Sequence, residues 1–170
     1  MAIVLPKLSR NYLSGRSRSS SIDEPELSVR LLSLQPCFLP GDVLEAEYSV
    51  VSPTTTSATE PSSHSLLSYI PRGESEGMQG LEISVIWYTE GKGTEDSGVH
   101  YFERITGSEL QRKITNNSCN FSTKLPISPL SYEGQLLNLR WCVRLRLFTS
   151  KGNDVCAQVP FYLGHVTREV

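Results

Sequence analysis

The segment LPISPLSYEGQLLNLRWCVRLRLF, residues 125–148, joins a proline-containing lead-in to a long alternating strand. Apolar side chains occupy every second position from Leu137 to Leu147, with Trp141 among them. The opposite parity carries three arginines, which are Arg140, Arg144 and Arg146. Successive side chains of a strand point to opposite faces of its sheet. The segment therefore predicts a strand with one face in a core and an arginine-bearing face outside it.

The same alternation recurs along most of the chain. It predicts seven strands, at residues 27–31, 43–50, 81–87, 99–105, 119–125, 136–148 and 155–163, with a turn at Pro40-Gly41-Asp42. None of these strands is followed by a convincing amphipathic helix. Strands with one polar face form antiparallel sheets, and two such sheets bury each other's apolar faces. The expected fold is all-β, an antiparallel immunoglobulin-like β-sandwich without the Cys-Trp-Cys spacing of a true immunoglobulin domain.

The expected domain organisation is one sandwich with flanking segments. Residues 1–26 are expected to form a flexible arm, 27–164 the sandwich, and 165–170 a C-terminal tail. Residues 52–80 interrupt the strand pattern, since 17 of these 29 positions are Ser, Thr, Pro or Gly. This insertion is either a functional loop or a disordered segment. The N-terminus is rich in Arg and Ser but lacks the features of a secretory signal.

Composition excludes several classes of protein. A chain of 170 residues with 38% hydrophobic and 20% charged residues fits one globular domain. Its net charge of -2 argues against a nucleic-acid partner, and no apolar run reaches the ~20 residues of a membrane span. The cysteines are dispersed, at Cys37, Cys119, Cys142 and Cys156. Free thiols are the favoured reading, with disulfides or a metal site as alternatives. A cytoplasmic location is expected.

The sequence carries little sign of catalytic or cofactor chemistry. His100 has no Cys, Asp or Glu at metal-ligand spacing, and His64 and His165 lie outside the predicted strands. Gly91-Lys92-Gly93 matches neither a phosphate-binding loop nor a dinucleotide motif, because it joins two strands and is flanked by acids. It predicts a long hairpin loop. We expect no cofactor, no metal and no enzymatic activity.

The predicted outer face of residues 136–148 is the candidate interaction surface. Arg140 and Arg146 would lie about 20 Å apart at about 3.3 Å per residue. One interpretation is a solvated face whose arginines pair with acids on neighbouring strands. The other is a surface for an anion or acidic peptide, because the arginine fork suits carboxylates and phosphates.

Residues 125–148 also resemble the N-domain pattern of arrestins. In that pattern an F-x-F-x-LP strand end leads through a Pro-Ser-Ser-Phe-Glu-Gly-like turn into an I-R-Y-x-V-x-A-x-L strand. The matching residues here are Phe121, Leu125, Pro126, Pro129, Ser131, Tyr132, Glu133, Gly134, Leu139, Arg140, Trp141, Val143 and Leu147. The segment FLPGDVLEAEYSV, from Phe38, is similar to the family's PGD turn, although Ala46 stands where glycine is common. The prolines should end the preceding strand, Gly134 should give the turn its backbone freedom, and Tyr132 should cap the sandwich edge.

The resemblance implies an arrestin N-domain type of sandwich acting through protein partners. Two departures limit it. The early strand has Arg30 as its only base, so the lysine pair with which receptor arrestins sense phosphate is missing. The chain also has room for one such domain instead of two. We therefore expect a non-enzymatic adaptor or scaffold; the alternative is a structural or homo-oligomeric assembly subunit, and an enzyme of unrecognised type comes third.

Overall fold

The computed structural model describes residues 25–51, 77–116, 118–150, 152 and 154–164. The strands are β1 (Glu26–Leu31), β2 (Cys37–Phe38), β3 (Val43–Val51), β4 (Met78–Gly91), β5 (Ser97–Ile105), β6 (Cys119–Lys124), β7 (Tyr132–Glu133), β8 (Leu137–Thr149) and β9 (Asp154–Leu163), with one helix, α1 (Gly107–Thr115). All seven predicted strands are present. The two that the sequence did not predict, β2 and β7, have two residues each and are too short to show an alternating pattern.

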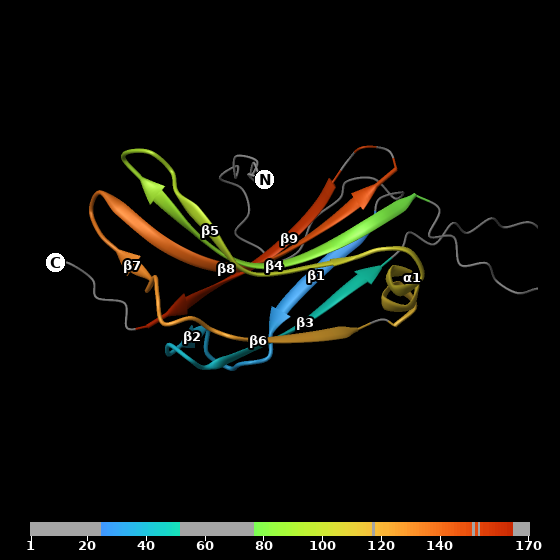
Figure 1. Ribbon diagram of the computed structural model, residues 1–170, viewed down its shortest axis with the longest axis horizontal. Coiled ribbons are helices and arrows are strands. Elements are labelled where there is room, and N and C mark those ends of the chain that lie inside the picture. The colour runs from blue at the N-terminus through green and yellow to red at the C-terminus, as the bar shows by residue number, and fades with distance from the viewer. Residues whose placement is uncertain (1–24, 52–76, 117, 151, 153, 165–170) are drawn as a thin grey trace, which may run out of the picture.

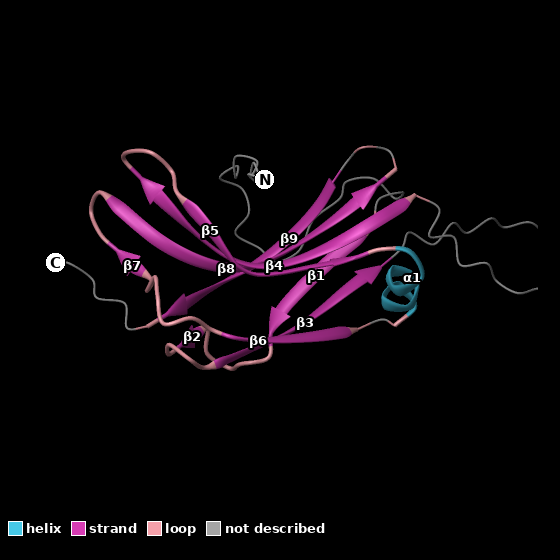
Figure 2. Ribbon diagram, in the orientation of Figure 1, coloured by secondary structure: helices cyan, strands magenta, loops and turns pink. Residues whose placement is uncertain are grey.

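The strands form two sheets that pack face to face (Figures 1 and 2). The smaller sheet has the order β1-β3-β6, and the larger has the order β2-β9-β8-β4-β5 with β7 added beside β8. Every pairing is antiparallel except that of β2 with β9, which is parallel. The predicted all-β, immunoglobulin-like sandwich is confirmed.

The core lies between the sheets and follows the predicted parity. In β8, Trp141, Val143, Leu145 and Leu147 are all fully buried. Facing strands contribute the same kind of residue, including Leu44, Ala46, Tyr48, Leu81, Ile83 and Val85. Within the larger sheet the Trp141 and Phe161 rings lie 5.8 Å apart, and Phe161 meets Phe38 edge-on at 5.6 Å. Across the two sheets the Tyr101 ring of β5 stacks on the Phe121 ring of β6 at 5.5 Å. Burial of this apolar surface is the main driving force for the fold.

Helix α1 corrects the prediction that no strand is followed by an amphipathic helix. Leu110 is buried and Ile114, four residues on, packs against the core. Glu109 lies in the first turn and Arg112 and Lys113 in the last, as the helix dipole favours. Nine residues with two apolar anchors give a weak periodic signal, which explains the miss. In the described ranges no helix is long and apolar enough to cross a membrane.

Strand β4 begins at Met78, three residues before the predicted start at Leu81. Gln79 and Gly80 carry no strand signal, and a register irregularity between Met78 and Gly80 breaks the alternation. The predicted insertion at residues 52–80 therefore overlaps the start of a strand. Most of that insertion, most of the N-terminal arm and the C-terminal tail lie outside the described residues.

The two segments that resemble the arrestin pattern meet at one end of the sandwich. The Leu125 N–H donates to the Asp42 carbonyl at 2.8 Å, and the Gly41 N–H donates to the Leu125 carbonyl at 3.2 Å. The lead-in is fixed at a second point by Trp141, whose indole N–H donates to the Pro129 carbonyl at 2.9 Å. These bonds position the start of β8 and direct Trp141 inward.

Ser131 and Gly134 fix the rest of the lead-in. Ser131 is buried and exchanges bonds with Leu163, accepting from the Leu163 N–H at 2.9 Å and donating its own N–H to the Leu163 carbonyl at 2.8 Å. A Cβ at Gly134 would lie 2.6 Å from the Tyr132 ring. A side chain at position 134 would therefore displace the Tyr132 ring, which lies over the turn with 38% of its surface exposed.

Candidate interaction surface

The larger sheet is bent along its two longest strands, β4 and β8 (Figure 1). The bend makes its outer face, which points away from the smaller sheet, concave. We call this the concave face; it consists of the outward side chains of β5, β4, β8 and β9. Strand register places Arg104, Glu82, Arg146 and Cys156 in one row, Phe102, Ser84, Arg144 and Gln158 in the next, and Val99, Ile86, Cys142 and Pro160 in a third.

Ion pairs occupy both ends of the concave face. At one end the Arg140 Nε donates to a Glu90 carboxylate oxygen at 2.7 Å. At the other end Arg146 contacts Asp154 at 2.6 Å, while Arg104 contacts Glu82 at 3.3 Å. Two of the three predicted arginines are thus paired with acids on neighbouring strands.

The aromatic ring of Phe148 contacts the guanidinium groups of both Arg146 and Arg104. The Arg146 guanidinium carbon lies 4.9 Å from the centre of the Phe148 ring, and that of Arg104 lies 5.2 Å from it. Cation–π contact and the acids together hold these side chains in place at the end of the sheet. Their charges are therefore already compensated within the chain.

The middle of the concave face is buried, which corrects the prediction of a solvated surface. Ile86 and Cys142 are each 1% exposed, and Ser84, Arg144 and Gln158 are 4–6% exposed. The parity of Arg144 and Cys142 was predicted correctly, but their exposure was not. Alternation predicts the side of the sheet that a residue takes, but it does not predict how much of that residue meets water.

Arg144 is the unusual residue of this buried middle. Among the described residues its guanidinium has no ion pair, and its Nε is buried with no hydrogen-bond partner. Its backbone carbonyl accepts a long bond from the Ser84 hydroxyl, at 3.4 Å. Removing a charge from water is costly unless a partner compensates it. A buried polar group without a partner therefore calls for an explanation.

The thiols of the concave face are expected to be unreactive. Burial raises the pKa of Cys142 to about 12, although the nearby Arg144 charge opposes that shift. Burial also raises the pKa of Cys156, again against the arginine charges. The thiolate is the nucleophilic form of cysteine, so neither thiol is activated by its surroundings. All four cysteines are free.

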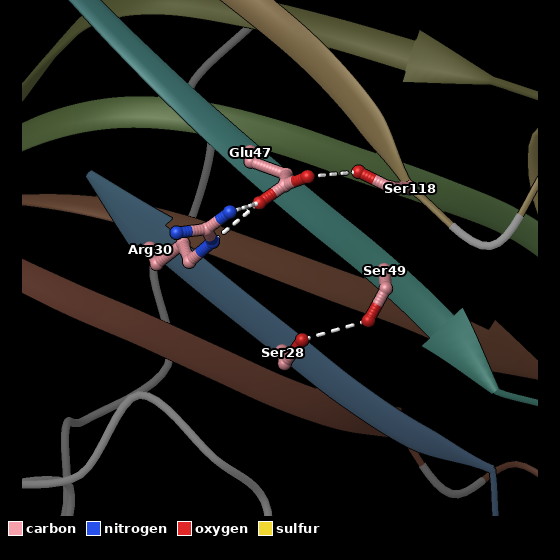
Figure 3. Close-up of polar contacts among 5 residues, drawn as sticks. All are labelled: Ser28, Arg30, Glu47, Ser49 and Ser118. Carbon is pink, nitrogen blue, oxygen red and sulfur yellow. Dashed lines mark hydrogen bonds and ion pairs between the residues drawn. The ribbon is translucent and has the colours of Figure 1, made fainter. Parts of the chain in front are cut away.

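On the outer face of the smaller sheet, by contrast, the polar side chains are paired with one another (Figure 3). The Glu47 carboxylate accepts from Arg30 on β1 and from the Ser118 hydroxyl just before β6. The Ser28 and Ser49 hydroxyls are bonded at 2.7 Å. The Ser118 hydroxyl and then Arg30 lower the pKa of Glu47. These groups are paired with one another and in contact with solvent.

The remaining predicted features lie elsewhere. His100 shares a 2.8 Å bond between its Nε2 and the Lys124 carbonyl, and its ring meets Trp141 edge-on at 6.2 Å. Gly91-Lys92-Gly93 lies in the hairpin between β4 and β5, as predicted. In the described part of the chain, no three His, Cys, Asp or Glu side chains are grouped to hold a metal. His64 and His165 lie outside the described residues.

Comparison with known proteins bears on the fold. No protein-family model matches the sequence, and no curated protein matches it. The chain is similar in structure to Spo0M, the sporulation control protein from Bacillus subtilis, with a TM-score of 0.51 and 12% sequence identity. The fold is arrestin-like. The match covers 83% of this chain and 49% of Spo0M, so the arrestin-like sandwich spans about half the length of that protein.

Sequence reasoning missed Ile86 and Cys142 as members of the candidate surface. One signal was present for Ile86, because Val85, Ile86 and Trp87 form an apolar run that breaks the alternation of β4. A register irregularity falls at this point in the pairing with β5, between Val85 and Ile86. For Cys142 the small, weakly polar side chain gave no signal.

Proposed function

We propose that this chain is a non-enzymatic protein-interaction module, an adaptor or scaffold, and that a partner docks on the concave face. The observation that carries this proposal is the pair of exposed apolar side chains, Phe102 and Val99, that edge strand β5 adds to that face. Exposed apolar side chains beside an unpaired strand edge are typical of a contact surface.

Strand β5 supports the same assignment. It is the last strand of the larger sheet, and its outward Phe102 and Val99 are 49% and 41% exposed. An edge strand offers unpaired backbone groups to an extended partner. A partner on the concave face would thus contact these two exposed apolar side chains along the edge of the sheet.

The chemistry of the described side chains favours binding over catalysis. The Cys142 and Cys156 thiols have raised pKa values, and His100 is held by a backbone carbonyl. Free thiols are usual in a reducing compartment, which supports a cytoplasmic site of action. The arrestin-like fold, which is similar to that of the sporulation control protein Spo0M, supports an interaction role.

Site-resolved crosslinking tests the proposal. A photoreactive amino acid replaces Phe102 on the concave face and, as the matched control, Ser122 on the outer face of the smaller sheet. The expected result is one reproducible adduct in source-cell lysate from the Phe102 position and none from the Ser122 position. Adducts from both positions at equal yield, or from neither, would contradict a partner on the concave face.

The mass of the adduct separates the two kinds of assembly. An adduct with a different protein supports the adaptor or scaffold role. An adduct of twice the chain mass, matched by a dimer in sedimentation of the purified chain, would instead establish the homo-oligomeric alternative.

A further inference from the structure

We infer that the partner on the concave face adds an extended strand to the free edge of β5, and that this strand carries a lysine or arginine next to an apolar residue. This inference rests on the proposed function and gives the form and chemistry of the partner. Three features of β5 support it: the exposure of its outward side chains, its unpaired edge and the charge of Glu103.

The exposure of outward side chains rises sharply at β5. Phe102 is 49% exposed, whereas its neighbour Ser84 on β4 is 4% exposed. Val99 is 41% exposed, whereas its neighbour Ile86 on β4 is 1% exposed. In the described part of the chain β4 has a strand on each side, while β5 has β4 alone. An added strand would place its own outward side chains against Phe102 and Val99, because the Cβ atoms of directly opposed residues lie about 4.5–5.5 Å apart.

The second feature is the edge of β5, which is open for backbone pairing. Strand β5 has nine residues, from Ser97 to Ile105, and β4 is its only partner among the described strands. Alternate N–H and C=O groups on its other side therefore have no strand partner. The pairing with β4 is regular over residues 101–105. This part of β5 is thus a regular edge to which an extended segment of a partner can bond.

The third feature, Glu103, selects the chemistry of the added strand. Register places Glu103 beside Ile83, a core residue, so its side chain is on the inward face. The Glu103 carboxylate accepts from the Tyr101 hydroxyl at 2.7 Å and has no ion pair within the described ranges. An inward-pointing charge at a sheet edge disfavours an apolar strand there. A lysine or arginine opposite Glu103 would instead form a cross-strand ion pair.

A second copy of β5 does not supply this base. The one lysine or arginine of β5 is Arg104, which is on the outward face and is paired with Glu82. Directly opposed side chains of paired strands lie on the same side of a sheet, so Arg104 of a second copy cannot face the inward Glu103 in a continuous sheet. The added strand therefore comes from a different protein. Because residues 102 and 103 are consecutive, its apolar and basic residues are consecutive as well.

Peptide selection on the full chain tests this inference. A phage-displayed library of random decapeptides is panned on the wild-type chain, on Glu103→Gln and, as the matched control, on Glu45→Gln. Glu45 is an exposed acid of β3 on the outer face of the smaller sheet. We expect wild type and E45Q to enrich a Lys or Arg directly next to an apolar residue, and E103Q to lose the enrichment of the base.

Binding of one selected synthetic peptide gives the magnitude. Changing its base to glutamine, or Glu103 to glutamine, is expected to weaken binding roughly tenfold, because each change removes one member of an interfacial charge pair. Once either change is made, the other should have little further effect, as a double-mutant cycle can measure. E45Q should bind as wild type does.

Two backbone measurements test strand pairing on the wild-type chain, so they do not depend on the folding of a variant. Alternate N–H groups of a strand point to the same neighbour. N-methylation of the peptide should therefore abolish binding at alternate positions and be tolerated at the positions between them. The bound peptide should also slow hydrogen exchange of alternate amides in residues 101–105, by about tenfold or more.

Several results would overturn the inference: no enriched peptide, enrichment without a base, equal binding of the peptide by E103Q, or unchanged exchange of the β5 amides. A dimer in sedimentation of the free chain, with the same amides already protected, would also overturn it, because a second copy would then occupy the edge. If crosslinking at Phe102 still yields a partner protein, the proposed function stands while the added strand fails.

Discussion

The outer faces of the two sheets are built from the same alternating pattern, yet they differ in how their polar groups are satisfied. On the smaller sheet Glu47 binds both Arg30 and Ser118 in contact with solvent. On the larger sheet Arg144 is buried beside Ile86 and has no partner among the described residues. The difference goes with position, since the buried outward residues lie on the inner strands of the larger sheet, β4, β8 and β9. Parity decides which face a residue takes, but it does not decide whether that face meets water.

The largest expected difference between the faces is in thiol reactivity. The pKa of Cys142 is raised to about 12 by burial, so its thiolate fraction at pH 8 is about a thousandfold smaller than that of an ordinary thiol. A Ser122→Cys variant places a matched thiol on the outer face of the smaller sheet. Mass-spectrometric rates of iodoacetamide labelling should show the thiol introduced by Ser122→Cys reacting at least that much faster than Cys142. Equal rates would mean that the concave face is open to solvent.

Truncation of Ile86 tests whether the middle of the concave face contributes to stability. Ile86→Ala should lower the free energy of unfolding by about 2–5 kcal/mol, as for a core residue, because the side chain is 1% exposed. Val43→Ala is the control, because Val43 is an outward β-branched residue of the smaller sheet that is 56% exposed, and it should cost less than about 0.5 kcal/mol. Urea denaturation measures both. Similar costs would remove the distinction between the faces.

Replacing an arginine by methionine should change the free energy of unfolding differently in the two sheets. Arg144→Met removes a buried charge without a partner and is expected to raise the free energy of unfolding by about 1–3 kcal/mol. Arg30→Met removes an exposed paired charge and should change it little. Urea denaturation of both variants checks this. A marked loss of stability in R144M would show that the charge is compensated within the folded chain.

The smallest expected effect concerns acid titration of the smaller sheet. The pKa of Glu47 is lowered mainly by the Ser118 hydroxyl and then by Arg30. Because the folded pKa lies below the unfolded one, the contribution to stability is present above the unfolded value and is lost as pH falls through the folded value. Ser118→Ala should move the pKa of Glu47 back up, as ¹³C NMR of the carboxyl group can measure. Ser49→Ala, which does not touch Glu47, should leave it unchanged.

Much of the fold could be predicted from the sequence because alternation is a local signal. The period-two pattern gave the seven main strands, the inward direction of Trp141 and the hairpin at Gly91-Lys92-Gly93. Helix α1 was missed because two apolar anchors, Leu110 and Ile114, do not make a convincing period. Strands β2 and β7 depend on long-range partners and have no pattern of their own.

The candidate surface was predicted only in part. The shared parity of Arg140, Arg144 and Arg146 was readable, and so was the pairing of arginines with acids on neighbouring strands. The sequence did not predict which arginine would lack a partner, because the partners depend on the register of β8 with β4 and β9. Burial of the middle of the face could not be read either, because alternation gives the side of the sheet that a residue takes and not its exposure.

The parallel pairing of β2 with β9 affects when the sandwich can finish folding during synthesis of the chain. Strand β9 lies between β8 and β2, so Cys37 and Phe38 find their sheet partners only in Tyr162 and Leu163. A ribosome delivers the chain from its N-terminus, and this early segment must wait for nearly the last residues of the domain to emerge. The newly made protein therefore closes its sandwich after synthesis of β9, and a chain that stops before Phe161 would leave Phe38 without its ring contact and one end of the core unsealed.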